Sequence, residues 1–344
     1  MKKIKELWPD QKLILVCRKG IGEFFAKTQI VDQVFEIKKG DSDSYKQVLQ
    51  ALSKVDVERV ISPHESLRTA FFVSKIKARE KIAFAKAWNG LFYGQRVRKN
   101  YELPDAIRQL SLLQNFDTNL KNNIDAYAAY SEAYTVAADG KLTATPSWAS
   151  MSLRGFYNHH SADIEKTLAK FSLSREKAAK SVALFPGSVW ATKRWTEEGY
   201  IQAGQKLSLQ GVPVLVMGGP GEEALCARVA GQIPGAVDLC AKTSIYESAL
   251  VLSQLAAVVG NDSASMHLAA TSETPSVVVF GPTVLEFGFR PWQDHVFVVE
   301  KPDLECRPCG KHGHKKCPIG THVCMKSISK DEVLEKLKGV LHGA

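Results

Sequence analysis

Small and polar residues follow apolar runs at several points in the second half of the chain, as they do where a strand ends at a ligand. In residues 258–268 (VVGNDSASMHL), Gly260 ends the apolar run, and Asp262, Ser263 and Ser265 precede a helical pattern. The first N–H groups of such a helix can bind an anion together with either serine hydroxyl. Asp262 could instead cap the helix, which is the simpler structural explanation. Both interpretations stay open on the sequence alone.

Two further segments have the same character. Residues 280–283 (FGPT) place Gly281 where the backbone can approach a phosphate closely and Thr283 where it offers a hydroxyl, although such a segment alone is more often a simple turn. Residues 185–195 (FPGSVWATKRW) are not a Walker A loop, because the second glycine directly before the lysine is absent. Ser188 and Lys193 nevertheless suit a phosphate site, with the lysine acting as a point charge.

Acidic residues after another glycine-rich segment could contact a ribose. Residues 218–221 (GGPG) do not match the GxGxxG pattern, which argues against a dinucleotide-dependent dehydrogenase. Glu222 or Glu223 could accept hydrogen bonds from ribose hydroxyls. The alternative is a pair of solvated acids at the start of a helix.

In the first half of the chain, His64 and Arg68 follow a predicted strand. His64 and Glu65 do not begin an HExxH zinc motif, because Arg68 occupies the fifth position. The two basic residues could face an anionic substrate, and a surface salt bridge explains them equally well.

Four of the seven cysteines cluster near the end of the chain, at Cys306, Cys309, Cys317 and Cys324. In a reducing compartment such a cluster favours a metal over disulfides, and four thiols match a closed structural zinc site. A reduced cysteine-rich loop held by packing, or an iron–sulfur cluster, would also account for the pattern. We expect the loop at 304–325 to support the second domain and to take no part in chemistry.

The elements that must position these residues are most regular in the second half. Predicted strands alternate with helical patterns there, at Val182–Phe185, 212–217, 237–239, 256–260 and Ser276–Phe280. Such alternation predicts an α/β fold with a parallel sheet, which binds ligands at the carboxyl ends of its strands. The first half has predicted strands at 12–17, Val57–Ser62 and 81–85. We place the boundary between about 140 and 180, with domains at 1–160 and 175–330 and a C-terminal helix at 328–344.

Composition and charge limit the class of protein. The 344 residues suffice for two domains, and 45% hydrophobic residues with a mean hydropathy of −0.14 are typical of a globular protein. The net charge of +9 favours anionic partners, but no nucleic-acid-binding motif accompanies it, so we expect no nucleic acid partner. No apolar stretch is long enough for a bilayer and the start lacks a signal peptide's apolar region, so we expect a cytoplasmic protein.

Together these segments resemble the heptosyltransferase family (glycosyltransferase family 9), which adds heptose to the inner core of lipopolysaccharide. The resemblance rests on GNDSASMHLAA, TPSVVVFGPT, PGSVWATKRW and the cysteine pattern, and more loosely on LWPDQKLILVCRKGIGEFF and RVISPHESLRTA. It implies a GT-B fold, with two Rossmann-like domains whose parallel sheets face each other across a cleft. It also implies an ADP-heptose donor on the C-terminal domain, a lipopolysaccharide core acceptor on the N-terminal domain, and peripheral contact with the inner face of the inner membrane.

The resemblance also implies roles for individual residues. Lys193 and Ser188 would bind the diphosphate, Asp262 would touch the sugar or order its loop, and His267 would support that loop. Gly281 and Thr283 would cradle the phosphate, with Ser263 and Pro282 as further donor-binding residues. Glu222 or Glu223 would contact the ribose, and His64 and Arg68 would contact the acceptor's acid sugars. Transfer would invert the anomeric carbon without a metal cofactor, a carboxylate taking the acceptor's proton while positive charge and helix N-termini stabilise the leaving diphosphate.

One departure from the family concerns the catalytic base. Members usually begin with a strand and a Gly-Asp loop that supplies it, whereas KELWPD resembles the last turn of the helix that follows. We therefore expect the family's first strand and its aspartate to be missing from this sequence, and the base stays unidentified. Residues 19–23 (KGIGE) could replace that loop with a glutamate, but the spacing favours the loop after the second strand. One explanation is that the reading frame begins earlier, and we favour it because loss of a central strand would leave an exposed sheet edge. The other is that the chain is a paralogue that binds a nucleotide sugar without transferring it. A different GT-B enzyme that uses a UDP-sugar is a third interpretation.

Overall fold

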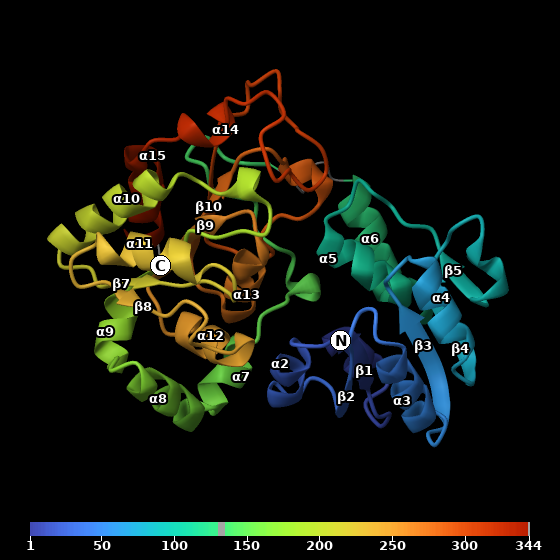
Figure 1. Ribbon diagram of the computed structural model, residues 1–344. Helices are drawn as coiled ribbons and strands as arrows, with labels where there is room; N and C mark the ends of the chain where they lie inside the picture. Colours follow the sequence, from blue (N-terminus) through green and yellow to red (C-terminus); the bar gives the residue numbers. More distant parts are fainter. Residues whose placement is uncertain (130–134, 343–344) are drawn as a thin grey trace. The chain divides into compact units, whose positions relative to one another are not determined.

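The chain divides into two compact units, unit 1 (residues 1–131) and unit 2 (residues 132–344) (Figure 1). The computed structural model describes residues 1–129 and 135–342. Within these residues, none of the helices combines the length and apolar character needed to span a bilayer. The division lies ahead of the predicted boundary at 140–180, so the predicted first domain of 1–160 is too long.

Residues 135–180 belong to unit 2 because they bond to its sheet and helices. Lys141 forms a β-bridge with Phe297. The Leu153 N–H donates to the Thr271 carbonyl over 2.7 Å, and Trp292 Nε1 donates to the carbonyl of residue 149 over 2.8 Å. These contacts could not be anticipated from a segment that contains no strand of its own.

Unit 1 contains two parallel sheets. One pairs β1 (Ile14–Arg18) with β2 (Gln33–Ile37), and the other has the order β3 (Val57–Ser62), β4 (Ala78–Phe84), β5 (Gln95–Val97). One apolar cluster contains residues of α3 together with residues of β1, β2 and β3, so a common core serves both sheets. The helices of unit 1 are α1 (Lys2–Leu7), α2 (Gly22–Lys27), α3 (Ser42–Leu52), α4 (Leu67–Ser74), η1 (Asn89–Leu91), α5 (Asp105–Leu110), η2 (Ser111–Phe116) and α6 (Thr118–Ala129).

The helical turn predicted at the start of the chain is confirmed as α1, whose C-cap is Trp8. The strand expected to precede this helix stays a prediction. The predicted strand at Val57–Ser62 is confirmed with the same bounds.

Unit 2 is built on one six-stranded parallel sheet with the order β11-β10-β9-β6-β7-β8. Its strands are β6 (Val182–Phe185), β7 (Val214–Val216), β8 (Val237–Asp238), β9 (Ala257–Asn261), β10 (Ser276–Phe280) and β11 (Val296–Glu300). The parallel arrangement and the predicted bounds of β6 and β10 are confirmed, while β11 was not predicted.

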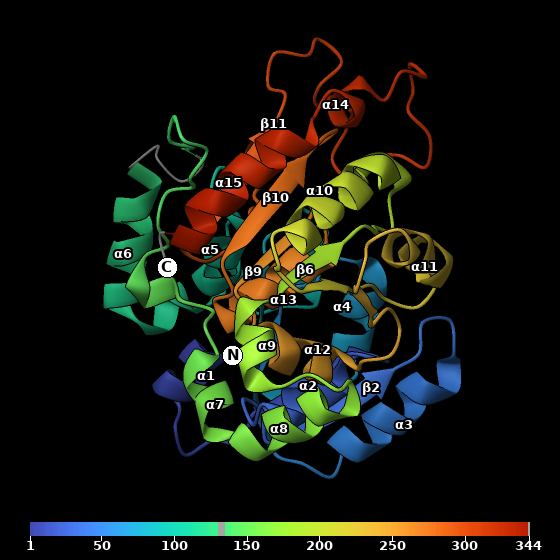
Figure 2. The same cartoon turned by 90° about the vertical axis from the view of Figure 1, so that its left-hand side faces the viewer.

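Helices cover both faces of this sheet. Alternate strand residues such as Val259 join an apolar cluster with α10 (Glu197–Leu209), α11 (Glu223–Gly231) and α15 (Lys330–His342), and Figure 2 shows α15 alongside β10. The next residue, Gly260, faces α13 (Ala264–Ser272), because a Cβ there would lie 2.6 Å from Met266 Cε. The remaining helices are α7 (Arg154–His159), α8 (Ser161–Lys170), α9 (Arg175–Lys180), α12 (Ile245–Leu252), α14 (Val323–Lys326), η4 (Ser147–Ala149), η5 (Ala191–Lys193) and η6 (Leu285–Phe287).

Candidate functional site

The loops after β6 and β9 separate at the middle of the sheet of unit 2. These two strands are neighbours, but the chain passes from β6 to β7 and β8 on one side, and from β9 to β10 and β11 on the other. In parallel sheets such a switch point leaves room for a ligand between the diverging loops. The predicted donor-binding residues follow β6, β7, β9 and β10, so they fall at this end of the sheet.

Asn261, the last residue of β9, ties the two loops together. Its side-chain N–H₂ group donates to the carbonyls of Phe185, Pro186 and Gly187 over 3.2, 3.1 and 3.1 Å. Its oxygen accepts from the Trp195 N–H over 2.8 Å. Because Asn261 is completely buried, these bonds fix the path of the chain after β6.

Lys193, Asp262 and Thr283 meet in a buried cluster that joins the loops after β6, β9 and β10. Lys193 Nζ forms an ion pair with Asp262 Oδ2, and Thr283 Oγ1 donates to the same oxygen over 2.7 Å. Lys193 is 9% exposed and Asp262 7%, so water screens the pair little. The sequence predicted all three residues but not that Asp262 neutralises Lys193.

The alternative in which Asp262 caps the following helix is wrong. The N-cap of α13 is Ser263, and no side chain makes a capping hydrogen bond there. The Ser263 hydroxyl bonds to Ser265 Oγ instead, over 2.7 Å. The first N–H groups of α13 are therefore not engaged by a side-chain cap. His267 lies on the same helix and is half-buried, and its supporting role stays a prediction.

Glu222 and Glu223 have different surroundings. The Glu222 carboxylate lies against the backbone after β6, since a Cβ added to Gly187 would come within 2.1 Å of it, and it accepts from the Gly219 N–H over 2.9 Å. The exposed Glu223 accepts from the Gly221 N–H over 2.7 Å. Only Glu222 therefore borders the loop that carries Ser188.

Ser188 has a cationic neighbour that sequence reasoning missed. Ser188 is 5% exposed, and its carbonyl accepts from Arg194 Nε over 2.8 Å. The half-buried Arg194 directly follows Lys193, so the loop after β6 carries two adjacent cations. The KR pair within TKRW was a signal that could have identified it.

Residues 281–283 contact side chains and backbone from the last part of the chain. A Cβ on Gly281 would lie 2.6 Å from Met325 Cε, so glycine is needed for close packing there. Arg307 donates to the carbonyls of Gly281 and Thr283 over 2.6 and 2.8 Å and forms an ion pair with Glu300. The N–H of Cys309 donates to the Pro282 carbonyl over 2.8 Å. Arg307 was not predicted as a residue that shapes this loop.

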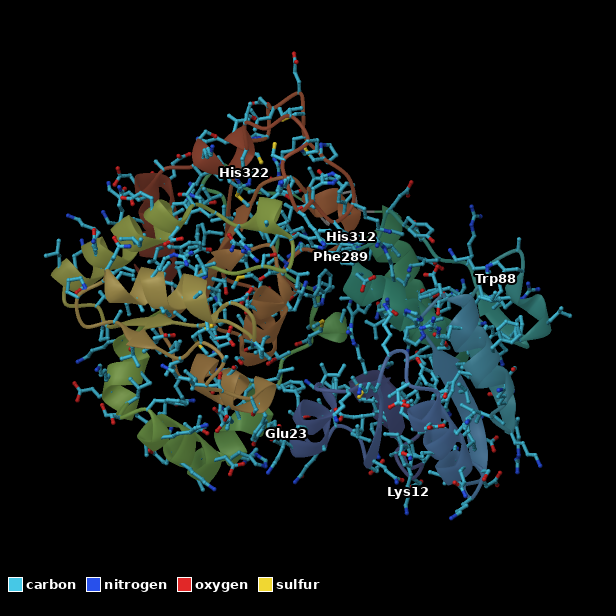
Figure 3. All side chains as sticks on the ribbon, in the orientation of Figure 1. Lys12, Glu23, Trp88, Phe289, His312 and His322 are labelled. Carbon is cyan, nitrogen blue, oxygen red and sulfur yellow. The ribbon has the colours of Figure 1, made fainter. Side chains whose placement is uncertain are left out.

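The cysteine-rich loop also contacts the residue before Lys193. Thr192 Oγ1 lies 2.9 Å from the carbonyl of His314 and 2.7 Å from its N–H. The ring of His322, labelled in Figure 3, bonds through Nε2 to the Thr192 carbonyl over 2.8 Å. These contacts agree with the expected supporting role of residues 304–325.

The four clustered cysteines are free thiols. Burial, together with the charges of Cys309, Cys306 and Cys317, raises the pKa of Cys324 to about 11, so the four sulfur atoms influence one another. Within residues 1–129 and 135–342, no three His, Cys, Asp or Glu side chains are arranged to hold a metal ion. The structural zinc site stays a prediction for metal analysis to test.

In unit 1, His64 and Arg68 lie at the start of α4 with different environments. His64 Nδ1 lies 2.7 Å from Thr69 Oγ1 and 3.1 Å from Ser66 Oγ, whereas the Arg68 side chain is exposed. Burial acts to raise the pKa of Glu65, but hydrogen bonds from Lys86 and Lys99 outweigh it and lower that pKa. The carboxylate next to His64 is therefore already neutralised by two lysines.

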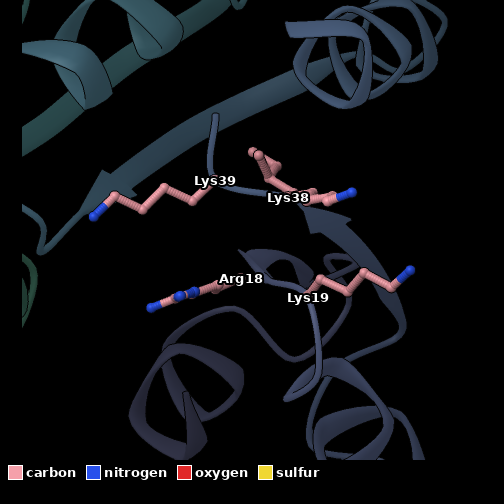
Figure 4. Close-up of a pocket in the computed structure, with 5 residues that line it drawn as sticks. Arg18, Lys19, Lys38 and Lys39 are labelled. Carbon is pink, nitrogen blue, oxygen red and sulfur yellow. The ribbon is translucent and has the colours of Figure 1, made fainter. Parts of the chain in front are cut away.

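A second group of cations in unit 1 was missed. Arg18 is the last residue of β1 and Lys19 follows it, and Lys38 and Lys39 follow β2, so the four side chains line a pocket of about 480 Å³ at the carboxyl ends of paired strands (Figure 4). Arg18 and Lys39 extend in one direction, and Lys19 and Lys38 in the other. Among the described residues, no carboxylate forms an ion pair with these four side chains. The repeated pattern of two basic residues and a glycine after each strand was a readable signal.

Known proteins resemble the chain in sequence. The family model for glycosyltransferase family 9 (heptosyltransferase) matches residues 45–319. Lipooligosaccharide heptosyltransferase 2 of Campylobacter jejuni is 32% identical over 168 residues, which cover 47% of this chain and 51% of that protein. The chain thus spans about half the length of the curated relatives it matches.

Solved structures resemble the chain over almost its whole length. The glycosyl transferase family 9 protein of Veillonella parvula has a TM-score of 0.73 at 17% identity, covering 99% of this chain and 91% of that chain. The ADP-heptose lps heptosyltransferase II of E. coli has a TM-score of 0.71 at 16% identity, with coverages of 99% and 92%. At such identities these likenesses show the fold, and the predicted GT-B fold with parallel sheets is confirmed.

Proposed function

Because this chain belongs to glycosyltransferase family 9, we propose that it transfers a heptose, or a related sugar, from an ADP-activated donor to the inner core of lipopolysaccharide. The observation that carries the proposal is the buried junction of Lys193, Asp262 and Thr283 at the switch point of unit 2. Three strand ends converge there around a cation, as a diphosphate site requires.

The donor would lie with its diphosphate between the loops after β6, β9 and β10. Lys193 and Arg194 supply positive charge, the N-terminus of α13 supplies N–H groups, and Thr283 contributes a hydroxyl. Glu222 is the better ribose contact of the two acids, because it borders the loop after β6 whereas Glu223 is exposed. Asp262 holds Lys193 in place in the absence of donor.

The acceptor would bind to unit 1 through its anionic groups. Residues 1–131 contain 23 lysines and arginines against 15 aspartates and glutamates, a net charge of +8, whereas residues 132–344 carry 22 against 21. The four cations at the carboxyl ends of β1 and β2 offer a second anion contact besides His64 and Arg68. Attraction to an anionic surface supports peripheral binding at the inner face of the inner membrane.

The chemistry that this arrangement supports is an inverting displacement without a metal cofactor. An acceptor oxygen attacks the anomeric carbon, the bond from that carbon to the diphosphate breaks, and a carboxylate accepts the acceptor's proton. Lys193, Arg194 and the N–H groups of α13 stabilise the charge that develops on the leaving diphosphate. The carboxylate that acts as base is not assigned to a residue of this chain.

Calorimetry with ADP-heptose tests donor binding, and sugar transfer to a truncated core acceptor tests catalysis. We expect wild-type protein to bind ADP-heptose more tightly than a UDP-sugar, and Lys193→Ala and Asp262→Ala to weaken binding at least about tenfold, equivalent to about 1.4 kcal/mol. Unchanged binding in both variants would contradict the assigned site. Donor binding without transfer would favour the alternative, a paralogue that binds a nucleotide sugar and does not transfer it.

A further inference from the structure

Large apolar side chains gather on the outer side of α4 and η1 in unit 1. Leu67 and Phe71 lie one turn apart on α4 and are 51% and 52% exposed, while Trp88 and Leu91 are 40% and 95% exposed. The ring of Phe92 lies between those of Phe71 and Trp88, with centroids 5.2 and 6.2 Å away. We call these five residues the aromatic face. Figure 3 shows Trp88 at the rim of unit 1, on the side of α4 and β5.

The segment that carries the aromatic face is also the most basic part of the chain. Residues 66–101 contain nine lysines and arginines and a single acid, Glu80. Arg96 lies directly against η1, since a Cβ on Gly90 would come within 3.0 Å of its guanidinium. Arg68, Arg96 and Arg98 are exposed, and among the described residues no carboxylate pairs with them. The charge and the exposed apolar area therefore coincide.

This combination fits an anionic bilayer better than other partners. Basic side chains attract anionic head groups, while aromatic and aliphatic side chains enter the boundary with the acyl chains. Single-stranded nucleic acid would need flat rings on which bases stack, but two aliphatic leucines belong to the face and its rings pack at 77° and 71° to each other. The centre of a protein interface is usually depleted of charged residues.

We propose that the aromatic face is the surface by which this protein binds an anionic membrane, with Leu67, Phe71, Trp88 and Leu91 entering the lipid boundary and Arg68, Arg96 and Arg98 contacting head groups. The inference rests on the proposed function, in which the acceptor is linked to lipid. It adds the residues that bring unit 1 to the bilayer.

Co-sedimentation of the full chain with vesicles tests the proposal. One set contains phosphatidylcholine alone and the other phosphatidylcholine with phosphatidylglycerol. We expect binding to the anionic vesicles, and about tenfold weaker binding for Leu91→Ser and for Phe71→Ser, because each variant lacks an exposed apolar side chain that membrane binding would bury in the lipid. The matched control is Leu209→Ser, at the end of α10 in unit 2, where the leucine is 82% exposed. This control should bind like wild-type protein.

Several results would overturn the inference. The first is equal binding of the wild-type protein to both vesicle types. The second is vesicle binding that stays unchanged in both Leu91→Ser and Phe71→Ser, or that falls equally in Leu209→Ser. The third is that the protein binds single-stranded oligonucleotide through Leu91 and does not bind vesicles. Calorimetry with ADP-heptose on the same samples separates this inference from the proposed function. Donor binding with no vesicle binding removes only the membrane inference. Vesicle binding that depends on Leu91 without donor binding removes the proposed function and supports the membrane surface.

Discussion

Asp262 holds the ammonium group of Lys193 in a buried ion pair, although the two residues lie 69 positions apart in the sequence. The pair joins the loop after β6 to the end of β9, at the point in the sheet of unit 2 where the order of the strands reverses. A charge at this depth needs its partner, because removing one member leaves the other buried without compensation.

The first prediction concerns the coupling of this pair. Lys193→Met and Asp262→Asn should each destabilise the protein by about 3–5 kcal/mol, because each leaves an uncompensated or poorly paired polar group. The double variant should lose less than the sum of the two, by about 0.5–3 kcal/mol. Urea unfolding of the four proteins measures this difference. Strictly additive losses would show that the two side chains do not interact in solution.

A second prediction concerns Asn261. Asn261→Asp keeps the size and the oxygen that accepts from the Trp195 N–H, but it removes both donors to the carbonyls of residues 185–187. We expect a loss of at least about 3 kcal/mol, since several buried groups lose their partners and a charge faces carbonyl oxygens. Asn123→Asp, on the exposed part of α6, is the control and should change stability little. Equal unfolding midpoints for the two variants would contradict the role assigned to Asn261.

The strand ends of unit 2 could be predicted from the sequence, but the contacts among their side chains could not. Apolar runs of the right length identified β6, β9 and β10, and small residues marked the loops that follow. Asn261 counted only as part of a motif, because its hydrogen-bond partners come from a loop 66 to 76 positions away. Helix capping by Asp262 was an open alternative on the sequence alone, and the start of α13 decides against it, because its N-cap is Ser263.

Other omissions have separate physical causes. Arg307 lies in an irregular segment without periodicity, so nothing in its neighbourhood indicated that it binds two carbonyls of the loop after β10. The boundary was placed too late because residues 135–180 add to the sheet of unit 2 through bridges and side-chain bonds and contribute no strand. The basic pairs at the carboxyl ends of β1 and β2 can be read from the sequence, but their proximity depends on the pairing of the two strands.

A third prediction concerns the packing of Gly281 on Met325. Gly281→Ala should lower the thermal unfolding midpoint, because the new Cβ would lie 2.6 Å from Met325 Cε and a well-packed core resists added volume. The cost should be about 1–3 kcal/mol. Gly281→Ala should cost less stability in a Met325→Ala background than in the wild-type protein, because the side chain that the new Cβ would meet is absent. If Gly281→Ala costs the same in both backgrounds, Met325 is not the neighbour that requires glycine.

A fourth prediction separates the two acids after β7. If Glu222 contacts the donor's ribose as proposed, Glu222→Gln should weaken ADP-heptose binding about tenfold, because an amide is a poorer acceptor for the ribose hydroxyls than a carboxylate. Glu223→Gln is the matched control, since Glu223 is exposed and bonds only to its own loop through the Gly221 N–H. Calorimetry on both variants measures the difference. Equal affinities for the two, whether both reduced or both normal, would argue against Glu222 as the ribose contact.

The last prediction tests metal binding by the cysteine-rich loop. If the four clustered cysteines hold zinc, anaerobically purified protein should contain about one equivalent, and all four thiols should resist alkylation until a chelator removes it. After chelation, Cys306, Cys309 and Cys317 should react before Cys324, which is 6% exposed while they are half-buried. Cys226 is the internal control, because it is completely buried far from the cluster in sequence and should stay unreactive throughout. Less than about a tenth of an equivalent of zinc or iron, together with rapid alkylation before chelation, would show that the loop is held by packing and by its bonds to Thr192, Pro282 and Thr283.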